Sequence, residues 1–202
     1  MPTLLDALRE RTQVDCDTMD YELAKELGPF VDCTSNQAIA YFELSRPATG
    51  DSLLHHDALI KEAIKSARDQ LQQLQGPITF EEFVVEIMMV KLQLLFIPYV
   101  TGYVHVQTNT KYSYCTKSTI ENAKRIVAIF EALAPELGTK RLCIKIPSTW
   151  EGLQACMALE FEGIRTLATT MFCMEQAVLA ERVGCTYIAP YVNELKVHFD
   201  KG

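Results

Sequence analysis

Hydrophobic positions along the chain follow two alternating periods, which predict strands separated by helices. Short apolar runs typical of buried strands occupy 14–16, 30–34, 103–107, 141–146, 164–169 and 186–189. Stretches with apolar residues at helical spacing occupy 20–27, 53–74, 79–96, 116–133, 148–162, 174–183 and 192–199. Capping signals support two of these helices: Asp20 before the first, and Thr79 with Glu82 as a capping box before the third.

Strands separated by helices pair in parallel through right-handed crossovers. Such βα units build either an open doubly wound sheet or a barrel. The open sheet would carry a glycine-rich phosphate loop, but the sequence contains neither GxGxxG nor GxxxxGK[ST]. We therefore predict an α/β fold of the TIM-type barrel class, as a single domain over residues 1–202. The pattern supplies about six of the eight βα units of a complete barrel, so we expect an incomplete barrel that is short at its C-terminus.

Composition and charge exclude several classes of protein. Hydrophobic residues make up 49% and charged residues 22% of the chain, which are ordinary values for a globular protein and not for a disordered one. The net charge of -7 disfavours binding to nucleic acid. The longest apolar stretch, 83–100, is interrupted by Glu86, Lys91 and Pro98, so we expect no membrane span. With no apolar leader at the N-terminus, we predict a cytoplasmic protein.

Cysteine and histidine spacing predicts no metal site and no cofactor. The seven cysteines include no CxxC pair, which favours reduced thiols, and Cys16, Cys33 and Cys143 are expected to be small core residues. The four histidines lack paired ligand spacing. We interpret His55-His56, which lies in a polar stretch, as solvated and not as metal-binding.

Polar residues gather where the predicted strands end, which is where a barrel places its chemistry; they are Asp17, Asn36, Gln107 to Asn109, Lys145, Thr169 and Tyr191. Lys145 interrupts an apolar strand, and burying an ammonium group there is costly. One explanation is a lysine paired with a carboxylate. The other is a neutral amine, favoured by desolvation, which attacks a carbonyl and forms a Schiff base.

The segment around Lys145, IKIPSTWEG over residues 144–152, resembles the Schiff-base strand of the transaldolases. Further segments resemble that family in the same order along the chain: Asp17-Thr18, Thr34-Ser35-Asn36, Tyr112-Ser113-Tyr114, Glu162-Gly163-Ile164, Phe172, Gln176 and 188–192. The resemblance extends over about residues 8–195. It implies a TIM-type barrel and class I aldol cleavage and transfer, with a small carbonyl compound as the partner and without a cofactor.

Roles for individual residues follow from the resemblance. Lys145 would form the Schiff base, and Asp17 would transfer protons and contact substrate hydroxyls. Asn36, in the segment that begins at Thr34, would hydrogen-bond the donor substrate. Thr169 would hold the catalytic water together with Gln107.

The chain departs from the transaldolases at several of these positions. Transaldolases usually carry Glu in place of Gln107, and Gln cannot exchange a proton at neutral pH. The related fructose-6-phosphate aldolase branch also has Gln there, and this chain resembles that branch at Leu167, Ala189 and Tyr191. Tyr191 would then act as the acid and base, or would serve only as a packing aromatic residue.

Two departures disfavour a phosphorylated substrate. Glu194 stands where the family has an Arg that grips the substrate phosphate, and a carboxylate repels a phosphate that Arg would clamp. Asn109-Thr110-Lys111 replaces Asp-Ala-Arg, which removes another charge pair.

The predicted function is therefore a Schiff-base aldolase or transferase on an unphosphorylated or apolar carbonyl compound, in a specialised, secondary-metabolite pathway. The alternatives are a non-catalytic homologue that binds a partner or metabolite, and a cyclase or condensing enzyme that uses the pocket without an imine. An incomplete barrel leaves strand edges unpaired, so we expect a homodimer, or another oligomer, to cover the open edge, or a C-terminal segment around 192–202 to fold over it.

Overall fold

The computed structural model describes residues 3–48, 54–70 and 78–192. The chain divides into two compact units. The first comprises residues 1–106 and 126–142, and the second comprises residues 107–125 and 143–202.

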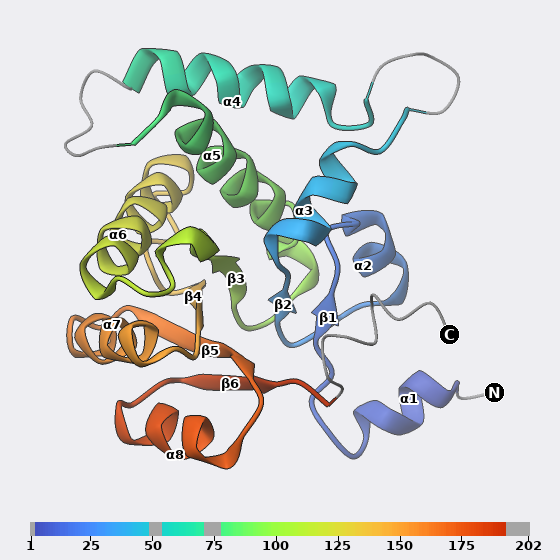
Figure 1. Cartoon of the computed structure of the whole chain (residues 1–202). Helices are drawn as coiled ribbons and strands as arrows, with labels where there is room; N and C mark the ends of the chain where they lie inside the picture. The colour runs from blue at the N-terminus through green and yellow to red at the C-terminus, as the bar shows by residue number, and fades with distance from the viewer. Residues whose placement is uncertain (1–2, 49–53, 71–77, 193–202) are drawn as a thin grey trace, which may run out of the picture. The chain divides into compact units, whose positions relative to one another are not determined.

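Six strands form the sheet in sequence order (Figure 1): β1 Cys16–Asp17, β2 Cys33–Thr34, β3 Val104–Gln107, β4 Leu142–Pro147, β5 Arg165–Met171 and β6 Tyr187–Pro190. The pairs β1–β2, β2–β3, β4–β5 and β5–β6 are parallel. Parallel neighbours in sequence order with helices between them are the strand order of a TIM-type barrel. The predicted fold class, an incomplete TIM-type barrel with six βα units, is confirmed.

The first unit carries α1 Leu4–Arg9, α2 Tyr21–Leu27, α3 Gln37–Leu44, α4 Asp57–Gln70 and α5 Phe80–Leu94, besides a 3-10 turn Ile97–Tyr99. The two predicted caps are confirmed: the Asp20 carboxylate accepts from the Glu22 and Leu23 amides, and Thr79 with Glu82 forms a capping box. These caps satisfy amides that a helix N-terminus leaves without a partner.

The second unit carries the 3-10 turn Thr110–Tyr112, α7 Trp150–Phe161 and α8 Met174–Arg182, while α6 Thr116–Leu133 runs through both units. The Thr149 hydroxyl caps α7 by accepting from the Gly152 amide. No helix in residues 3–48, 54–70 or 78–192 is long and apolar enough to cross a membrane.

Several element boundaries differ from the predicted ones. Helices α1 and α3 were not predicted, since both are short and α3 begins directly behind a strand end at Asn36. Of the strand predicted at 30–34, only Cys33–Thr34 forms β2, and Phe30 forms an isolated bridge with Val100. The predicted helix at 192–199 lies almost wholly outside the described residues, as does the end of the helix predicted at 53–74.

Cysteines of the strands lie in the core, as predicted: Cys16, Cys33 and Cys143 are buried, and all seven thiols are free. Cys16 pairs with Cys33 in the register of β1 and β2. Hydrogen bonding to Cys16, together with burial, raises the pKa of the Cys33 thiol, so Cys33 is poorly suited to act as a nucleophile.

Candidate active site

Lys145 lies in the middle of β4, between two other buried residues of the second unit. Its register partner in β5 is Leu167. On the other side, the Thr108 amide donates to the Lys145 carbonyl oxygen at 3.0 Å, a bond that in a parallel ladder sets Gln107 beside Lys145. Lys145 is 7% exposed and Gln107 6% exposed. The structure therefore brings these three predicted residues into one row across β3, β4 and β5.

Thr169 belongs to the next row on the same face. It pairs with Pro147, and both residues lie two positions beyond Leu167 and Lys145, so their side chains share a face of the sheet. Thr169 is buried, and the Ser148 amide donates to its carbonyl oxygen at 2.7 Å. The predicted grouping of Thr169 with Gln107 and Lys145 on one face is consistent with this register.

Beyond Thr169 the last part of β5 is irregular. Thr170 has a φ of 52° and is the only non-glycine residue with positive φ in the described part of the chain. Such a backbone is strained for a β-branched residue. The register between β5 and β6 shifts at the same place, between Ala168 and Met171. The ladder between β5 and β6 is therefore interrupted next to the row of Thr169.

Tyr191 follows β6 and packs against the loop after β5. Its ring stacks on Phe172 with centroids 5.1 Å apart, and its amide donates to the Met171 carbonyl oxygen at 2.9 Å. The residue is 41% exposed, so its ring is packed on one side and accessible on the other. Ala189, also predicted as a site residue, lies in β6 and is half-buried.

Asn109 lies behind β3, where its side chain takes part in a local turn. Its Oδ1 accepts from the Lys111 amide at 3.1 Å, and its own amide donates to Asn122 Oδ1 at 2.7 Å. These bonds give Asn109 a structural role at the start of the 3-10 turn, beside the proposed role in substrate binding.

Three predicted residues belong to the first unit. Asp17 pairs with Thr34 in the register of β1 and β2, and its side chain is exposed. Asn36 caps α3, since its Oδ1 accepts from the Ala38 and Ile39 amides at 2.9 and 3.0 Å. The sequence pattern indicated a substrate ligand at Asn36 and missed this capping role. Glu194 lies outside the described residues.

A cavity of about 650 Å³ opens where β4 and β5 end in the second unit. Its lining is polar and aromatic, with one charged residue: Thr110, Ser113, Tyr114, Pro147, Ser148, Thr149, Trp150, Glu151, Thr170, Phe172 and Gln176. Gln176 braces two of the loops, because its Nε2 donates to the Ser148 carbonyl oxygen and its Oε1 accepts from the Phe172 amide, both at 2.8 Å.

The Ser148 hydroxyl is the least satisfied polar group in this cavity. Ser148 is 3% exposed, and its Oγ has no hydrogen-bond partner among the described residues. A buried hydroxyl without a partner is costly. The sequence pattern placed Ser148, with Thr149, as a cap of the following helix, and the cap proves to be Thr149; nothing in a sequence marks which hydroxyl is left without a partner.

The chain matches the family Transaldolase/Fructose-6-phosphate aldolase over residues 14–202. It is similar to transaldolases of Gloeobacter violaceus (30% identical over 96% of this chain and 47% of the relative), Methylococcus capsulatus (31%, over 95% and 55%) and Histophilus somni strain 2336 (32%, over 96% and 57%). The chain thus spans about half the length of the curated relatives it matches. It belongs to the transaldolase/fructose-6-phosphate aldolase family.

Proposed function

We propose that this chain is a class I aldolase or transferase that forms a Schiff base through Lys145. The observation that carries the proposal is the placement of one lysine, 7% exposed, between Gln107 and Leu167 in the middle of a parallel sheet. A buried lysine amine in such a sheet is the kind of nucleophile that forms a Schiff base with a carbonyl compound. Family membership supports the same chemistry.

In the proposed reaction the Lys145 amine adds to a ketone, and the resulting carbinolamine loses water to give an iminium. Loss of a proton from the β-hydroxyl then breaks the adjacent C–C bond. The electron pair of that bond moves into the iminium, so an aldehyde leaves and an enamine remains. The enamine attacks an acceptor aldehyde or takes up a proton, and water releases the product and restores the amine.

Proton transfers in this scheme need a group other than Gln107. We propose Tyr191, whose ring is accessible on one side, as the acid and base. Gln107 and Thr169 would hold the water that enters and leaves. Asp17, Thr34 and Asn36 are proposed as substrate-binding residues, with Asp17 also in proton transfer, from the family resemblance alone.

We propose an unphosphorylated substrate that extends into the cavity, as part of a specialised pathway. Among the described residues that line the cavity, Glu151 is the one charged residue, and none is a lysine or arginine that could bind a phosphate dianion. The aromatic rings of Trp150 and Phe172 and the Ser148 hydroxyl suit an uncharged ligand with both apolar and hydroxyl surface.

An aldol addition assay, the reverse of the cleavage step, tests the proposal, because the iminium of a three-carbon ketone loses an α-proton to give the enamine that attacks the acceptor aldehyde. Dihydroxyacetone and hydroxyacetone serve as donors, and each acceptor aldehyde is compared with its phosphate ester. Lys145→Ala should abolish turnover, whereas Lys117→Ala, which changes an exposed lysine, should leave it unchanged. Turnover that survives Lys145→Ala would refute the imine mechanism, and a preference for the phosphate esters would refute the proposed substrate class.

We also propose that a second copy of the chain covers β6. In the described part of the chain β6 has β5 as its one neighbour, and Ile188 and Val192 are exposed there. An unpaired apolar edge of this kind favours association. Light scattering at micromolar concentration should show a dimer or larger oligomer that Ile188→Lys weakens. A stable monomer of the unsubstituted chain would contradict the proposal.

A further inference from the structure

Two adjacent histidines and a glutamate lie together in the first unit. Glu43, His55 and His56 each offer one potential ligand atom, and these atoms all lie within 4.8 Å of one another. His56 Nε2 lies 2.7 Å from Glu43 Oε1. The two imidazole rings are 4.6 Å apart at their centroids and nearly perpendicular, at 86°.

The expectation that both histidines are solvated is wrong for His56. His56 is 7% exposed and His55 is half-buried, and the Glu43 side chain is 11% exposed. The sequence separates Glu43 from His56 by 13 positions, so no ligand spacing was visible before the fold brought them together.

Backbone contacts hold the three side chains in this arrangement. Glu43 lies near the end of α3, and the His55 amide donates to the Arg46 carbonyl oxygen at 2.8 Å. Pro47 and Leu54 form an antiparallel bridge, which closes the chain between α3 and α4. The His56 carbonyl oxygen accepts from the Ile60 amide at the start of α4. The cluster is therefore fixed by the main chain and is not a chance meeting of flexible side chains.

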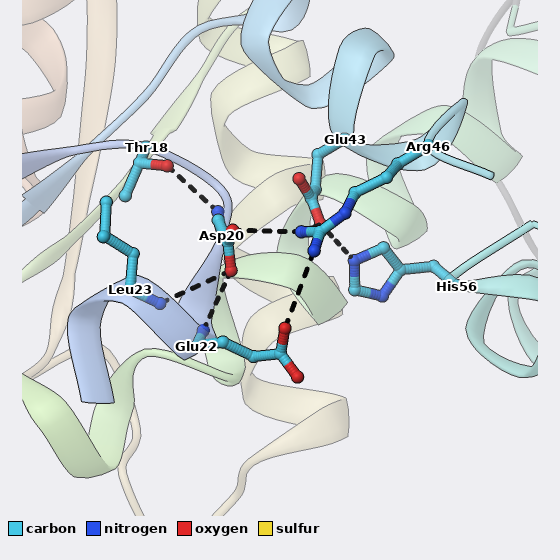
Figure 2. A network of polar contacts seen from close by, with 7 residues as sticks. All are labelled: Thr18, Asp20, Glu22, Leu23, Glu43, Arg46 and His56. Carbon is cyan, nitrogen blue, oxygen red and sulfur yellow. Dashed lines mark hydrogen bonds and ion pairs between the residues drawn. The ribbon is translucent and has the colours of Figure 1, made fainter. Parts of the chain in front are cut away.

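The surroundings carry more negative than positive charge. Arg46 contacts Asp20 at 3.0 Å, Glu43 at 3.4 Å and Glu22 at 3.7 Å (Figure 2). Three carboxylates thus share one guanidinium group, so negative charge exceeds positive charge among these four residues, which favours a nearby cation.

We propose that Glu43, His55 and His56 bind a divalent transition-metal ion, with Zn²⁺ the best suited. Two imidazole nitrogens and one carboxylate oxygen are a donor set that Zn²⁺ accepts, and a water molecule would complete four-coordination. Ligand atoms on a tetrahedral ion are about 3.4 Å apart at bond lengths of about 2.1 Å. On binding, His56 Nε2 and Glu43 Oε1 therefore move slightly apart from their present 2.7 Å, and the ligand nitrogen of His55 moves closer to them.

Binding replaces a proton by the metal. In a neutral His56 the proton between Nε2 and Glu43 moves to Nδ1 by exchange with solvent, and in a protonated His56 it is released to solvent; Nε2 and the carboxylate oxygen then both coordinate the ion. The bound ion would fasten α3 to the turn that precedes α4 and would add to the stability of the folded chain. This site is independent of the chemistry proposed for Lys145.

The test uses the full chain without a histidine tag, stripped with a chelator. Zn²⁺ is titrated calorimetrically, and Co²⁺ serves as a spectroscopic probe. We expect one site of micromolar affinity or tighter, intense d–d absorption typical of tetrahedral Co²⁺ without thiolate charge-transfer bands, and a higher Tm with Zn²⁺.

His55→Ala is the sharpest variant, because it removes a ligand while leaving the hydrogen bond between His56 and Glu43 in place. It should weaken Zn²⁺ binding at least tenfold and abolish the shift in Tm, and Glu43→Gln should do the same. A Cys115→Ser/Cys173→Ser double variant removes the exposed thiols and should bind as the unsubstituted chain does. Affinity unchanged by His55→Ala, affinity lost with the cysteines, or no binding would each overturn the proposal.

Discussion

Leu167 is the register partner of Lys145, so an apolar side chain covers one flank of the lysine in the sheet. Leu167→Ala should lower the free energy of unfolding by about 2–5 kcal/mol, as for other buried leucines. It should also slow imine formation near neutral pH, since water admitted beside the amine favours the ammonium form.

Leu159→Ala is the matched control, because Leu159 is buried on α7 and not on the strand face of Lys145. Chemical denaturation gives the two stability changes, and the rate of reductive trapping gives the two effects on the amine. Equal trapping rates in the two variants would show that Leu167 has no influence on Lys145 beyond packing.

Substitutions at two threonines of β5 should distinguish a residue that acts in the reaction from one that stabilises the fold. Thr169→Val should reduce turnover by about 10²-fold, the size of effect seen when a reacting group is misplaced, with little change in Tm. Thr166→Val should instead cost about 1.5–3 kcal/mol of stability at unchanged turnover, since the Thr166 hydroxyl donates to Glu160 at 2.7 Å. Steady-state kinetics and thermal unfolding of both variants measure these effects. Lost turnover in Thr166→Val with lost stability in Thr169→Val would contradict the two assigned roles.

Tyr191→Phe tests the acid and base proposed for this site. The substitution keeps the stacking on Phe172 and removes the phenol. Turnover should fall by about 10²–10⁴-fold, the usual contribution of general acid and base catalysis, and unfolding should be unaffected. Unchanged turnover would make Tyr191 a packing residue, and proton transfer would then fall to another group.

Cys115 should be the most reactive of the exposed thiols. The hydrogen bond between Cys115 Sγ and Ser118 Oγ, at 3.2 Å, and the amides at the start of α6 lower the pKa of Cys115. More thiolate is therefore present at neutral pH, so labelling should reach its plateau at a lower pH than for an ordinary thiol. Timed alkylation with peptide mass spectrometry compares Cys115 with the exposed Cys173. Ser118→Ala should slow the labelling of Cys115, and faster labelling of Cys173 in the unsubstituted chain would contradict the expectation.

The sequence predicted the parts of the fold that local pattern determines. An apolar run interrupted by Lys145 marked β4 and the candidate nucleophile, and Thr79 with Glu82 marked the start of α5. The pairing of Gln107 and Leu167 with Lys145 followed once the strands were ordered. By contrast, the contact between Glu43 and His56 depends on the turn between α3 and α4, and the unsatisfied Ser148 hydroxyl depends on the packing of three loops. Neither follows from residue types or their spacing.

Reductive trapping at Lys145 is the most direct test of the proposed chemistry. The full chain is incubated with dihydroxyacetone and borohydride, digested, and analysed by mass spectrometry. A stable adduct is expected on the peptide that contains Lys145, absent without the ketone and absent in Lys145→Ala. Lys117→Ala should retain the adduct. An unmodified Lys145 peptide with every carbonyl compound that the enzyme turns over, or an adduct that persists in Lys145→Ala, would contradict a Schiff base at this residue.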